Sequence, residues 1–466
     1  MDKDRIKQLM NVLWEKYPYA SIMAACAEGK NYSVSAAGTV ASQSPLLCQN
    51  GYVVRAYKPF AKDKGRYAEY SFNELDDGAL VEIPQILEKL FESMDESEWI
   101  KYDTVSEEEF VSFTENEFHD NPEEIGDKAI ISKLSKIRNK GLSMDERILD
   151  CRVNSSYQIY TKYFLSPKKE ASEKVLWMTG YVFMLAKKGE AVKSYFASFS
   201  NRDGIAVLDC MDNKLEDVAK ATVELLNAEQ ITPGEYECIC APDVTGMIVH
   251  EAFGHGVEMD MFVKDRALAK EYIGEYVASP LVTMHDGAAA AVETATYDFD
   301  DEGERGQDTV IIEKGILKRG ICDARTAACL GIKSTGNGRR ENYERKAYTR
   351  MTNTFFEGGT DKVEDMIASI KKGFYLENAT CGMEDPKNWG IQCMVNVARE
   401  IVDGKFTGKI YSPVVLSGYV PDLLKSISMM SEEAKLCGSG FCGKGYKEWV
   451  KVSDGGPFIK ATIKLG

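Results

Sequence analysis

The sequence predicts an α+β protein with two domains. A chain of 466 residues is long enough to bury two separate cores. The first half mixes helical and strand patterns, whereas the second half is rich in strand patterns around one helix. Thr232-Pro233-Gly234 interrupts the chain between the two halves. We therefore expect an N-terminal α/β domain over residues 1–231, with an antiparallel sheet and helices, and a β-rich C-terminal domain over residues 232–466.

The N-terminal segment is predicted to begin with a helix and to continue as strands. Residues 20–70 read as strands separated by turns, one of them at residues 28–31, and residues 84–94 read as a helix with proline in its first turn. The first helix spans residues 4–16, where apolar side chains recur with helical spacing and form one stripe: Ile6, Leu9, Met10 and Leu13.

The rest of the first half is predicted to contain helices and one long hairpin. Residues 95–150 are rich in acidic side chains and are expected to form solvated helices, amphipathic over residues 130–140, whose charges need no partner. Residues 175–199 alternate apolar and polar side chains around a Lys188-Gly189-Glu190 turn, which is typical of a hairpin. An amphipathic helix is expected at residues 216–227.

Strands and one unusual helix are predicted for the second half. A strand at residues 235–241 leads into this helix, for which Asp243 is the expected N-cap. Residues 310–321 read as two strands joined by a Lys314-Gly315 turn. Asp403-Gly404 indicates a second hairpin, because this pair accepts positive φ at both turn positions.

The composition excludes several classes of function. The net charge is −16, and no lysine and arginine cluster is long enough to follow a phosphate backbone, so we expect no direct nucleic-acid binding. No apolar run nears the length of a membrane span and the first residues carry no apolar signal, so we expect a cytoplasmic protein without a membrane segment. Twelve scattered cysteines without a C-x-x-C pair indicate reduced, mostly buried thiols.

The most informative motif is His250-Glu251-Ala252-Phe253-Gly254-His255, in a chain with only four histidines. Imidazole is a common zinc ligand, and a glutamate beside the metal can accept a proton from the attacking water. In a regular helix, however, side chains five residues apart point roughly 140° away from each other. A π-bulge would bring the two histidines to one side, and Gly254 lowers the steric cost of that distortion. The alternative is a buried helix with two hydrogen-bonded histidines.

A catalytic zinc needs a third protein ligand and leaves its fourth position to water. The sequence offers Glu258, His285, Asp286, Cys437 and Cys442 for that position. Glycines on both sides of Cys442 allow a tight loop whose thiolate could reach a metal. For any lone cysteine, the competing interpretation is a small buried hydrophobic residue.

Charged loops of the second half allow two interpretations. The glycine-rich turn at residues 335–340 ends in Arg339 and Arg340, whose guanidinium forks suit carboxylates. This loop could hold an acidic side chain or a peptide terminus, or it could be an exposed turn with solvated arginines. The acidic run at residues 298–304 is expected to be a solvated loop.

Four segments together resemble the TldD/PmbA metalloproteases, once called modulators of DNA gyrase. They are residues 250–258, 334–341, 350–354 and 442–445, and they occur in the order that this family shows. The resemblance is strong from about residue 235 to the end and weak before it.

The resemblance implies zinc ligands at His250, His255 and Cys442 and a catalytic glutamate at Glu251. Because the motif is intact, the chain resembles the active TldD type and not the PmbA (TldE) type that lacks the motif. Arg339, Arg340 and Asn353 are expected to contact the substrate. The resemblance also implies an N-terminal α/β domain, a β-rich C-terminal domain with a zinc-binding helix, and a homodimer or a heterodimer with a PmbA/TldE-like chain.

The predicted function is therefore a zinc-dependent peptidase. The resemblance implies that the dimer encloses a central cavity. Unfolded or flexible peptides would be bound in that cavity as an added strand and cut there. The negative thiolate beside the metal should weaken its Lewis acidity, which predicts a slow enzyme. The alternative function is a non-catalytic protein that regulates a partner such as DNA gyrase.

Overall fold

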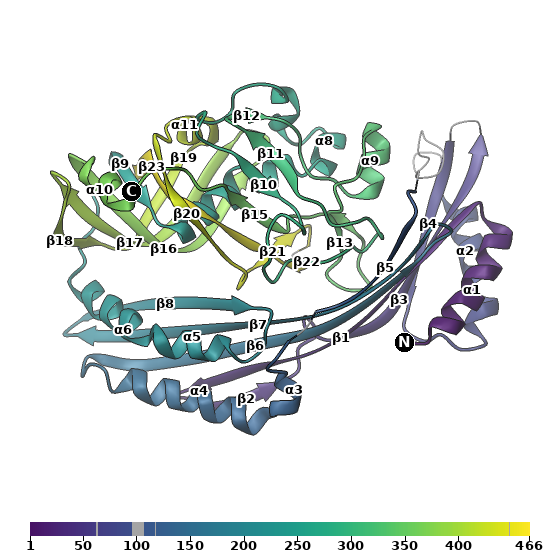
Figure 1. The fold of residues 1–466 in the computed structure, drawn as a ribbon, viewed down its shortest axis with the longest axis horizontal. Helices are drawn as coiled ribbons and strands as arrows, with labels where there is room; N and C mark the ends of the chain where they lie inside the picture. Colours follow the sequence, from purple (N-terminus) through teal and green to yellow (C-terminus); the bar gives the residue numbers. More distant parts are fainter. Residues whose placement is uncertain (62–63, 96–106, 117, 447) are drawn as a thin grey trace.

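Two large β-sheets, one in each half of the chain, form the protein (Figure 1). The structure is a computed structural model that describes residues 1–61, 64–95, 107–116, 118–446 and 448–466. The N-terminal sheet is long and curved, and the C-terminal half lies on its concave side (Figure 1). Helices and sheets occur in both halves, which confirms the predicted α+β class.

The N-terminal sheet has the strand order β4-β3-β1-β6-β7-β5, with β2 beside β1 and β8 beside β7. Neighbouring strands run antiparallel, as predicted, except that β5 is parallel to β7. The strands are β1 (Tyr19–Ser35), β2 (Gly38–Ser42), β3 (Gln49–Ala61), β4 (Lys64–Phe72), β5 (Phe110–Glu115), β6 (Ile148–Leu165), β7 (Lys169–Lys188) and β8 (Ala191–Asn201).

Helices cover the outer face of this sheet at both of its ends (Figure 1). One group is α1 (Lys3–Lys16) and α2 (Ala79–Ser93); the other is α3 (Pro122–Ile125), α4 (Asp127–Leu142), α5 (Val207–Asn213), α6 (Leu215–Glu224) and the 3₁₀ turn η2 (Leu225–Asn227). The four residues of the predicted α1 stripe are buried. Helix α4 contains the predicted amphipathic stretch at residues 130–140, and α6 with η2 covers the helix predicted at residues 216–227. Side chains alternate along β1: Ile22 packs with α1 and α2, whereas Met23 packs with Phe299 of the C-terminal half.

Two predictions for the first half are wrong because packing overrides local signals. β1 runs straight through residues 28–31, where a turn was expected. A Cβ on Gly29 would lie 2.3 Å from the Tyr157 carbonyl oxygen, so this glycine allows close strand approach and does not mark a turn. Helix α2 begins at Ala79, and Pro84 therefore lies inside it and not in its first turn. The buried face of α2 includes residues before the proline, which favours the longer helix.

The acidic segment is less solvated and less helical than expected. Residues 110–115 form strand β5, where a helix was expected, and residues 96–106 lie outside the described residues. The buried carboxylate of Glu107 accepts hydrogen bonds from the hydroxyl groups of Tyr19 (3.1 Å) and Ser166 (2.8 Å). The expectation that these charges need no partner is therefore wrong, because a buried carboxylate must be hydrogen-bonded.

Five strands of the C-terminal half close into a ring. β9 (Gly234–Cys240) pairs in parallel with β16 (Lys372–Asp385) and antiparallel with β23 (Ser453–Leu465). β17 (Gly390–Val402) and β19 (Val414–Tyr419) complete the ring between β16 and β23. The largest apolar core of the described residues lies around this ring.

The remaining elements of this half extend the ring or connect its strands. The strands are β10 (Met284–Asp286), β11 (Thr309–Glu313), β12 (Ile316–Leu317), β13 (Gly338–Arg339), β14 (Tyr348–Thr349), β15 (Asn353–Phe356), β18 (Lys405–Tyr411), β20 (Met429–Cys437), β21 (Phe441–Lys444) and β22 (Glu448–Lys451). The helices are α7 (Pro242–Val249), α8 (Asp260–Val263), α9 (Ala324–Leu330), α10 (Val363–Ala368) and α11 (Val420–Lys425), with short turns η3 (His250–Gly254), η4 (His255–Val257) and η5 (Leu268–Tyr272). Both hairpins predicted for this half are present, and Asp403 and Gly404 have φ values of 47° and 72°. The hairpin predicted at residues 175–199 is formed by β7 and β8.

Helix α7 follows β9 directly and packs against β16 and β23. Ala241 occupies its N-cap position and Pro242 is its first residue, so the expected N-cap at Asp243 is wrong. The Asp243 carboxylate instead accepts a hydrogen bond from the backbone N–H of Ala379 on β16 at 3.0 Å. This contact fixes the start of the helix to the ring.

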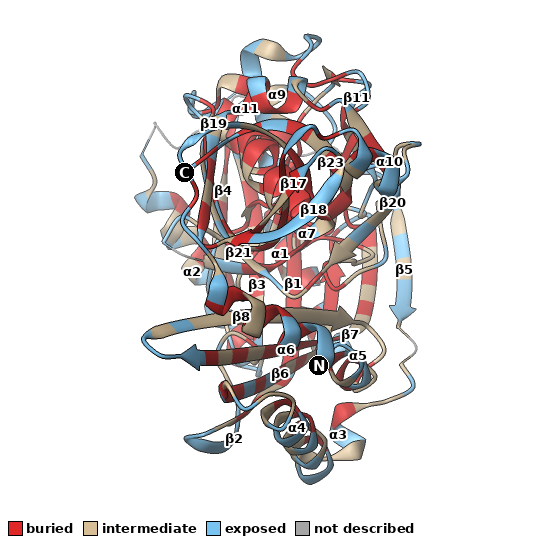
Figure 2. Cartoon of the chain, turned by 90° about the vertical axis from the view of Figure 1, so that its left-hand side faces the viewer, coloured by how far each residue is buried: buried red, intermediate tan, exposed pale blue. Residues whose placement is uncertain are grey.

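Turn η2 is the last element before the ring, which begins with β9. The division into domains between residues 231 and 232 stays a prediction. Buried residues run through both layers, and the outer strands β5 and β18 are largely exposed (Figure 2). Among the described residues, no helix is long and apolar enough to cross a membrane.

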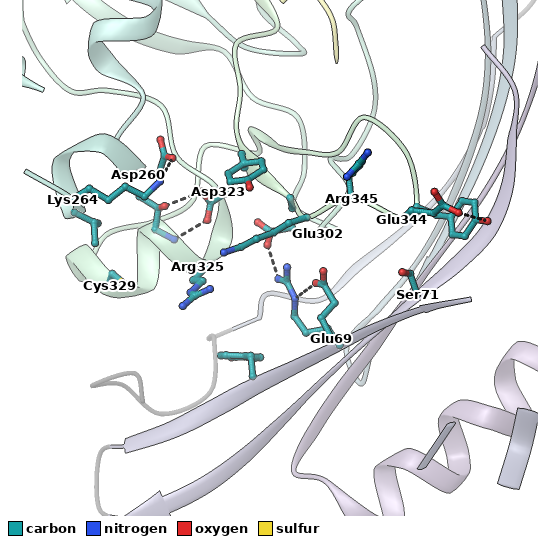
Figure 3. A pocket seen from close by; sticks show the side chains of 18 residues that line it. Glu69, Ser71, Asp260, Lys264, Glu302, Asp323, Arg325, Cys329, Glu344 and Arg345 are labelled. Atoms are coloured by element: carbon teal, nitrogen blue, oxygen red, sulfur yellow. Dashed lines mark hydrogen bonds and ion pairs between the residues drawn. The ribbon is translucent and has the colours of Figure 1, made fainter. Parts of the chain in front are cut away.

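A buried ion-pair network joins the two halves and corrects the expectation for residues 298–304. Asp300 and Glu302 are buried, not solvated. Arg55 of β3 pairs with Glu302 (2.5 Å) and with Glu69 of β4 (3.0 Å), as Figure 3 shows for the two carboxylates. The Arg340 fork holds both oxygens of Glu69 at 2.7 Å. The loop at residues 335–340 therefore binds an acidic side chain of its own chain. Arg55 and Arg340 both compensate the charge of Glu69, and Arg55 also compensates that of Glu302.

The pKa of Glu69 shows the strength of this contact. Burial would raise it, but Arg340 and Arg55 outweigh burial and lower the pKa from the usual 4.5 to about 2. A depressed carboxylate pKa stabilises the folded state above the unfolded pKa, and this contribution is lost as the pH falls from about 4.5 towards 2.

We predict that Arg340→Gln lowers the free energy of unfolding by about 2 kcal/mol at pH 7, less than for a fully buried pair because Arg55 still holds Glu69. Thermal denaturation between pH 2 and pH 7 should show a smaller pH dependence from 4.5 to 2 in Glu69→Gln than in the parent. Lys214→Gln, which breaks the exposed Asp217 pair, is the control and should change stability by less than about 0.5 kcal/mol. Equal effects of the Arg340 and Lys214 substitutions would contradict this role.

Candidate metal centre

The helix that carries the histidine motif changes its hydrogen-bonding pattern at the motif. After α7, residues His250–Gly254 form a π-helical turn, and His255–Val257 form a 3₁₀ turn. The backbone N–H of His255 bonds to the carbonyl oxygen of His250, an i to i+5 contact. The predicted departure from a regular α-helix is confirmed. A Cβ on Gly254 would lie 2.1 Å from the Met351 sulfur, so any side chain there would have to displace the buried Met351 side chain.

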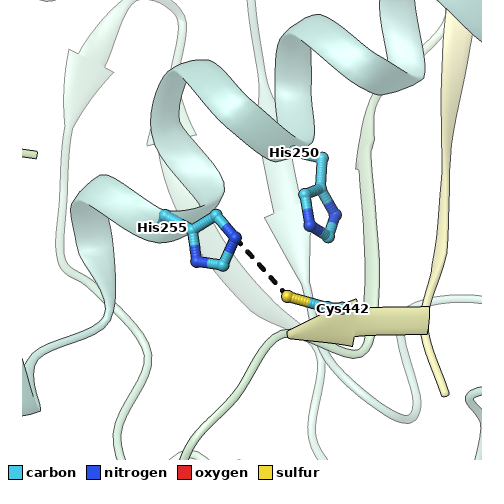
Figure 4. Close-up of side chains that lie close together, drawn as sticks. All are labelled: His250, His255 and Cys442. Carbon is cyan, nitrogen blue, oxygen red and sulfur yellow. Dashed lines mark hydrogen bonds between the residues drawn. The ribbon is translucent and has the colours of Figure 1, made fainter. Parts of the chain in front are cut away.

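The π-turn brings His250 and His255 together, and Cys442 meets them from strand β21 (Figure 4). The Cys442 Sγ lies 3.4 Å from Nε2 of His255, and one ligand atom from each of the three side chains lies within 4.8 Å of the others. The two imidazole rings are 5.1 Å apart between centroids and nearly perpendicular, at 88°. This is a compact set of two nitrogen donors and one sulfur donor.

Electrostatic attraction within the cluster favours the thiolate. Burial would raise the pKa of the Cys442 thiol, but His250 and His255 outweigh burial and hold it well below its usual 9.0. Burial would in turn lower the pKa of both imidazoles, and the nearby Cys442 sulfur raises them instead. The thiolate is the form of cysteine that binds metals. Imidazoles bind a metal only in their neutral form, so a metal that enters this cluster would displace their protons.

A second layer of charges orients the cluster. His255 Nδ1 lies 3.1 Å from the Glu258 carboxylate, which leaves Nε2 directed at Cys442. Glu258 also pairs with Lys444 at 3.1 Å. Burial would raise the pKa of Glu258, but Lys444 and His255 lower it to about 2. On the other side, His250 Nδ1 lies 3.6 Å from Asp454 of β23.

The other candidates for a third ligand are engaged elsewhere. His285 contacts Asp308 (2.6 Å) and Glu357 (2.9 Å). Asp286 accepts hydrogen bonds from three side chains, those of Thr352, Thr354 and Asn337. Cys437 lies 3.6 Å from Ser198 Oγ on β8. Within the part of the chain that the structure describes, Cys442 is the candidate that joins both motif histidines in one metal-ligand group.

Glu251 lies on the π-turn directly after His250 and is half-buried. Its side chain packs against Gly382 of β16, where a Cβ would lie 2.4 Å from Glu251 Cγ. Glu384, two residues further along the strand, has both carboxylate oxygens buried without a hydrogen-bond partner among the described residues. Burial is the main cause that raises its pKa well above 4.5.

The sequence analysis missed part of this surrounding layer. Glu258 was considered there as a third ligand and not as the partner of His255. Lys444 was not considered, although it stands two residues after Cys442. Asp454 and Glu384 come from β23 and β16 and carry no local motif, so only the strand arrangement reveals them.

The three residues expected to bind substrate occupy different environments. Arg339 donates to the Met351 carbonyl at 2.7 Å and lies over the Tyr297 ring. Arg340 holds Glu69. Asn353 is fully buried, and its amide donates to backbone carbonyls, including that of Gly287. Contact of these residues with a substrate remains a prediction, and Arg340 and Asn353 already have partners within the chain.

Comparison with known proteins assigns the C-terminal half. Residues 233–461 match the family model of the PmbA/TldA metallopeptidase C-terminal domain. A metalloprotease TldD homologue from Buchnera aphidicola is 30% identical over 275 residues, which cover 59% of this chain and 56% of that protein. A zinc metalloprotease TldD homologue from Saccharolobus solfataricus is 27% identical over 347 residues, which cover 72% and 75%. This chain thus spans just over half the length of the Buchnera relative.

A solved structure has the same fold as this chain over nearly its whole length. TldE from Thermococcus kodakarensis superposes with a TM-score of 0.74 and 19% sequence identity, covering 99% of this chain and 100% of that one. At this identity, the likeness concerns the fold alone. The N-terminal half, for which the sequence resemblance was weak, therefore has the same architecture as a known protein.

We predict that Cys442→Ser lowers zinc occupancy by at least tenfold, because the hydroxyl is a much weaker zinc ligand than the thiolate. Cys437→Ser should retain the zinc content of the parent, since this thiol lies near Ser198 and outside the cluster. Elemental analysis of the purified proteins measures both. Equal loss in the two variants, or loss in neither, would contradict the assignment of Cys442.

Glu258→Gln should weaken zinc binding about 10- to 100-fold, because the carboxylate that orients His255 is lost. A competition titration against a chromophoric chelator measures the dissociation constant. Glu357→Gln is a matched control, since it removes a carboxylate from His285, a histidine outside the cluster. If Glu258→Gln keeps the affinity of the parent, the orienting contact has no role in metal binding.

Proposed function

We propose that this chain, which belongs to the PmbA/TldD family of metallopeptidases, hydrolyses peptides with one zinc ion held by His250, His255 and Cys442. The observation that carries the proposal is the π-turn, which gathers both histidines beside Cys442 and places Glu251 next to His250. The name of the Saccharolobus relative, a zinc metalloprotease, supports the same metal.

The donor set fits a catalytic zinc. Two imidazoles and one thiolate are ligands that zinc prefers, and three protein ligands leave one position for water or substrate. A structural zinc would fill four protein positions, and the metal-ligand group found among the described residues has three members. The carboxylate of Glu258 supplies the outer contact that orients a histidine ligand in such sites, and Asp454 adds a negative charge near His250.

Zinc bound there would lower the pKa of the attacking water and polarise the scissile carbonyl group. The chain's own residues supply the proton transfers. Glu251 accepts the proton of the attacking water and delivers it to the leaving amine. Gly382 leaves the space that the Glu251 side chain occupies against β16, and any larger residue would displace this base. The Cys442 thiolate would place negative charge at the metal, which moderates the Lewis acidity and favours slow hydrolysis.

The substrate in this proposal is an unfolded protein or a flexible peptide. Such a chain would bind as an added strand inside the cavity of a dimer, where backbone hydrogen bonds give affinity with little demand on sequence. The partner subunit would be an identical chain or a TldE-like chain, and the shared fold with a TldE structure supports the second choice. The two domains of the proposed assembly are residues 1–231 and 232–466, and Arg339 would help to orient the peptide.

We predict that Glu251→Gln lowers hydrolysis of an unfolded protein by about 10²-fold or more, the usual scale for the loss of a general base. Zinc content and assembly mass should not change, because the metal-ligand group does not include Glu251. Chromatographic detection of cleaved peptides measures the rate, and Glu432→Gln, an exposed carboxylate, is the control.

Two results would overturn the peptidase assignment. The first is cleavage by Glu251→Gln at the rate of the parent. The second is a zinc-loaded parent that cuts no peptide but changes the activity of a partner such as DNA gyrase, which would favour a regulatory function.

A further inference from the structure

A cavity of about 460 Å³ lies between the two halves of the chain (Figure 3). Strands β3 and β4 form one wall, and helices α8 and α9 with the loop at residues 343–348 form the other. Its volume is within the range of pockets that bind small ligands and short peptide segments.

The buried acidic groups in the cavity wall already have partners. Glu69 is held by Arg340 and Arg55. Glu302 pairs with Arg55 and also accepts a hydrogen bond from the backbone of α9. Asp323 accepts hydrogen bonds from Thr326 and Thr349. These carboxylates are therefore neutralised or hydrogen-bonded before any ligand enters.

Two cations in the wall formed by α9 and the loop at residues 343–348 have no ion pair among the described residues. Among the described residues, no carboxylate lies within the 4 Å ion-pair distance of Arg325 or Lys346, and both side chains are exposed. Partial burial is the main cause that lowers the pKa of Lys346. The charges of Arg325 and Lys264 lower this pKa further, whereas the carboxylates of Glu69 and Asp323, beyond ion-pair distance, raise it. Glu344, the exposed carboxylate of the cavity, lies far from Arg325 at the opposite end (Figure 3). Since the whole chain carries a net charge of −16, this positive group is a local feature.

The cavity and the metal centre share one wall. Asp260 lines the cavity and accepts a hydrogen bond from Lys444 at 2.8 Å. Lys444 reaches Glu258 on its other side at 3.1 Å, and Glu258 holds His255. Lys444 also donates to the carbonyl of Thr349, the residue after the cavity residue Tyr348. A ligand in this cavity would therefore be separated from the cluster by the Lys444 side chain and its partners.

We propose that this cavity is a subsite for a carboxylate of the peptide substrate, with Arg325 and Lys346 as its cationic partners. The inference rests on the proposed peptidase function and specifies its substrate class. Carboxylates are the negative groups of an unmodified peptide, and a guanidinium fork with a nearby ammonium suits them. The carboxylate can come from the C-terminus or from an aspartate or glutamate side chain, and the peptides of the test distinguish these sources.

The test measures peptide binding by calorimetry in the Glu251→Gln variant, which binds but does not cut. Three versions of one flexible octapeptide without other acidic residues are compared: a free C-terminus, an amidated C-terminus, and an amidated C-terminus with one internal glutamate.

We expect the free carboxylate to improve the dissociation constant about tenfold over the amide, the scale of one charge-assisted contact. Arg325→Gln with Lys346→Gln should abolish this preference, and the matched surface variant Lys362→Gln should keep it. If the glutamate peptide also binds tightly, the subsite accepts side-chain carboxylates; if it binds like the amide, the subsite selects the C-terminus.

Three results would overturn the proposal: equal binding of the free and amidated peptides, a preference that survives in the double variant, or tighter binding of inorganic phosphate than of the free-carboxylate peptide. Hydrolysis by the zinc-loaded parent separates this inference from the proposed function. Hydrolysis without a carboxylate preference removes the subsite and leaves the peptidase. If the double variant loses the preference for the free carboxylate but the zinc-loaded parent hydrolyses no peptide, the carboxylate site stands and the peptidase function does not.

Discussion

The i to i+5 hydrogen bond between His255 and His250 is the contact on which the metal centre depends. In a regular helix, these side chains would point roughly 140° apart and could not bind one ion. The π-turn removes this mismatch, and Gly254 makes it possible because a side chain there would collide with Met351. Sequence and packing therefore both contribute to the irregular backbone, since the absence of a side chain at Gly254 leaves room for Met351 beside the turn.

The ring of strands positions everything that surrounds this turn. β9 leads straight into α7, and the Asp243 contact to Ala379 fixes the helix against β16. The same strand brings Gly382 against the base Glu251, while β23 brings Asp454 to His250. β21 adds the Cys442 sulfur from a different part of the chain, and the buried Arg350 holds the Cys442 carbonyl at 2.6 Å. The N-terminal sheet then covers this half through the Glu69 network, which makes the cavity of Figure 3 a feature of both halves.

Sequence patterns predicted the parts of this structure that local chemistry determines. The α1 stripe, the two hairpins and the π-turn follow from spacing and turn residues, and each is present. Errors arose where tertiary contacts decide: Gly29 serves strand packing, and the acidic residues near 300 are buried because Arg55, Lys162 and Lys169 reach them from the other half. The spacing of the motif left the third ligand open among five residues. Only the meeting of β21 with the π-turn sets Cys442 apart, and the role of that cysteine at a metal remains a proposal.

X-ray absorption at the zinc edge of the purified protein tests the central claim most directly, because it reads the ligand atoms without relying on activity. Our account predicts about two nitrogen neighbours near 2.0–2.1 Å, one sulfur near 2.3 Å and one further light atom, in a four-coordinate shell. A shell without sulfur, a shell with several sulfurs, or a six-coordinate oxygen shell would contradict a zinc bound by His250, His255 and Cys442.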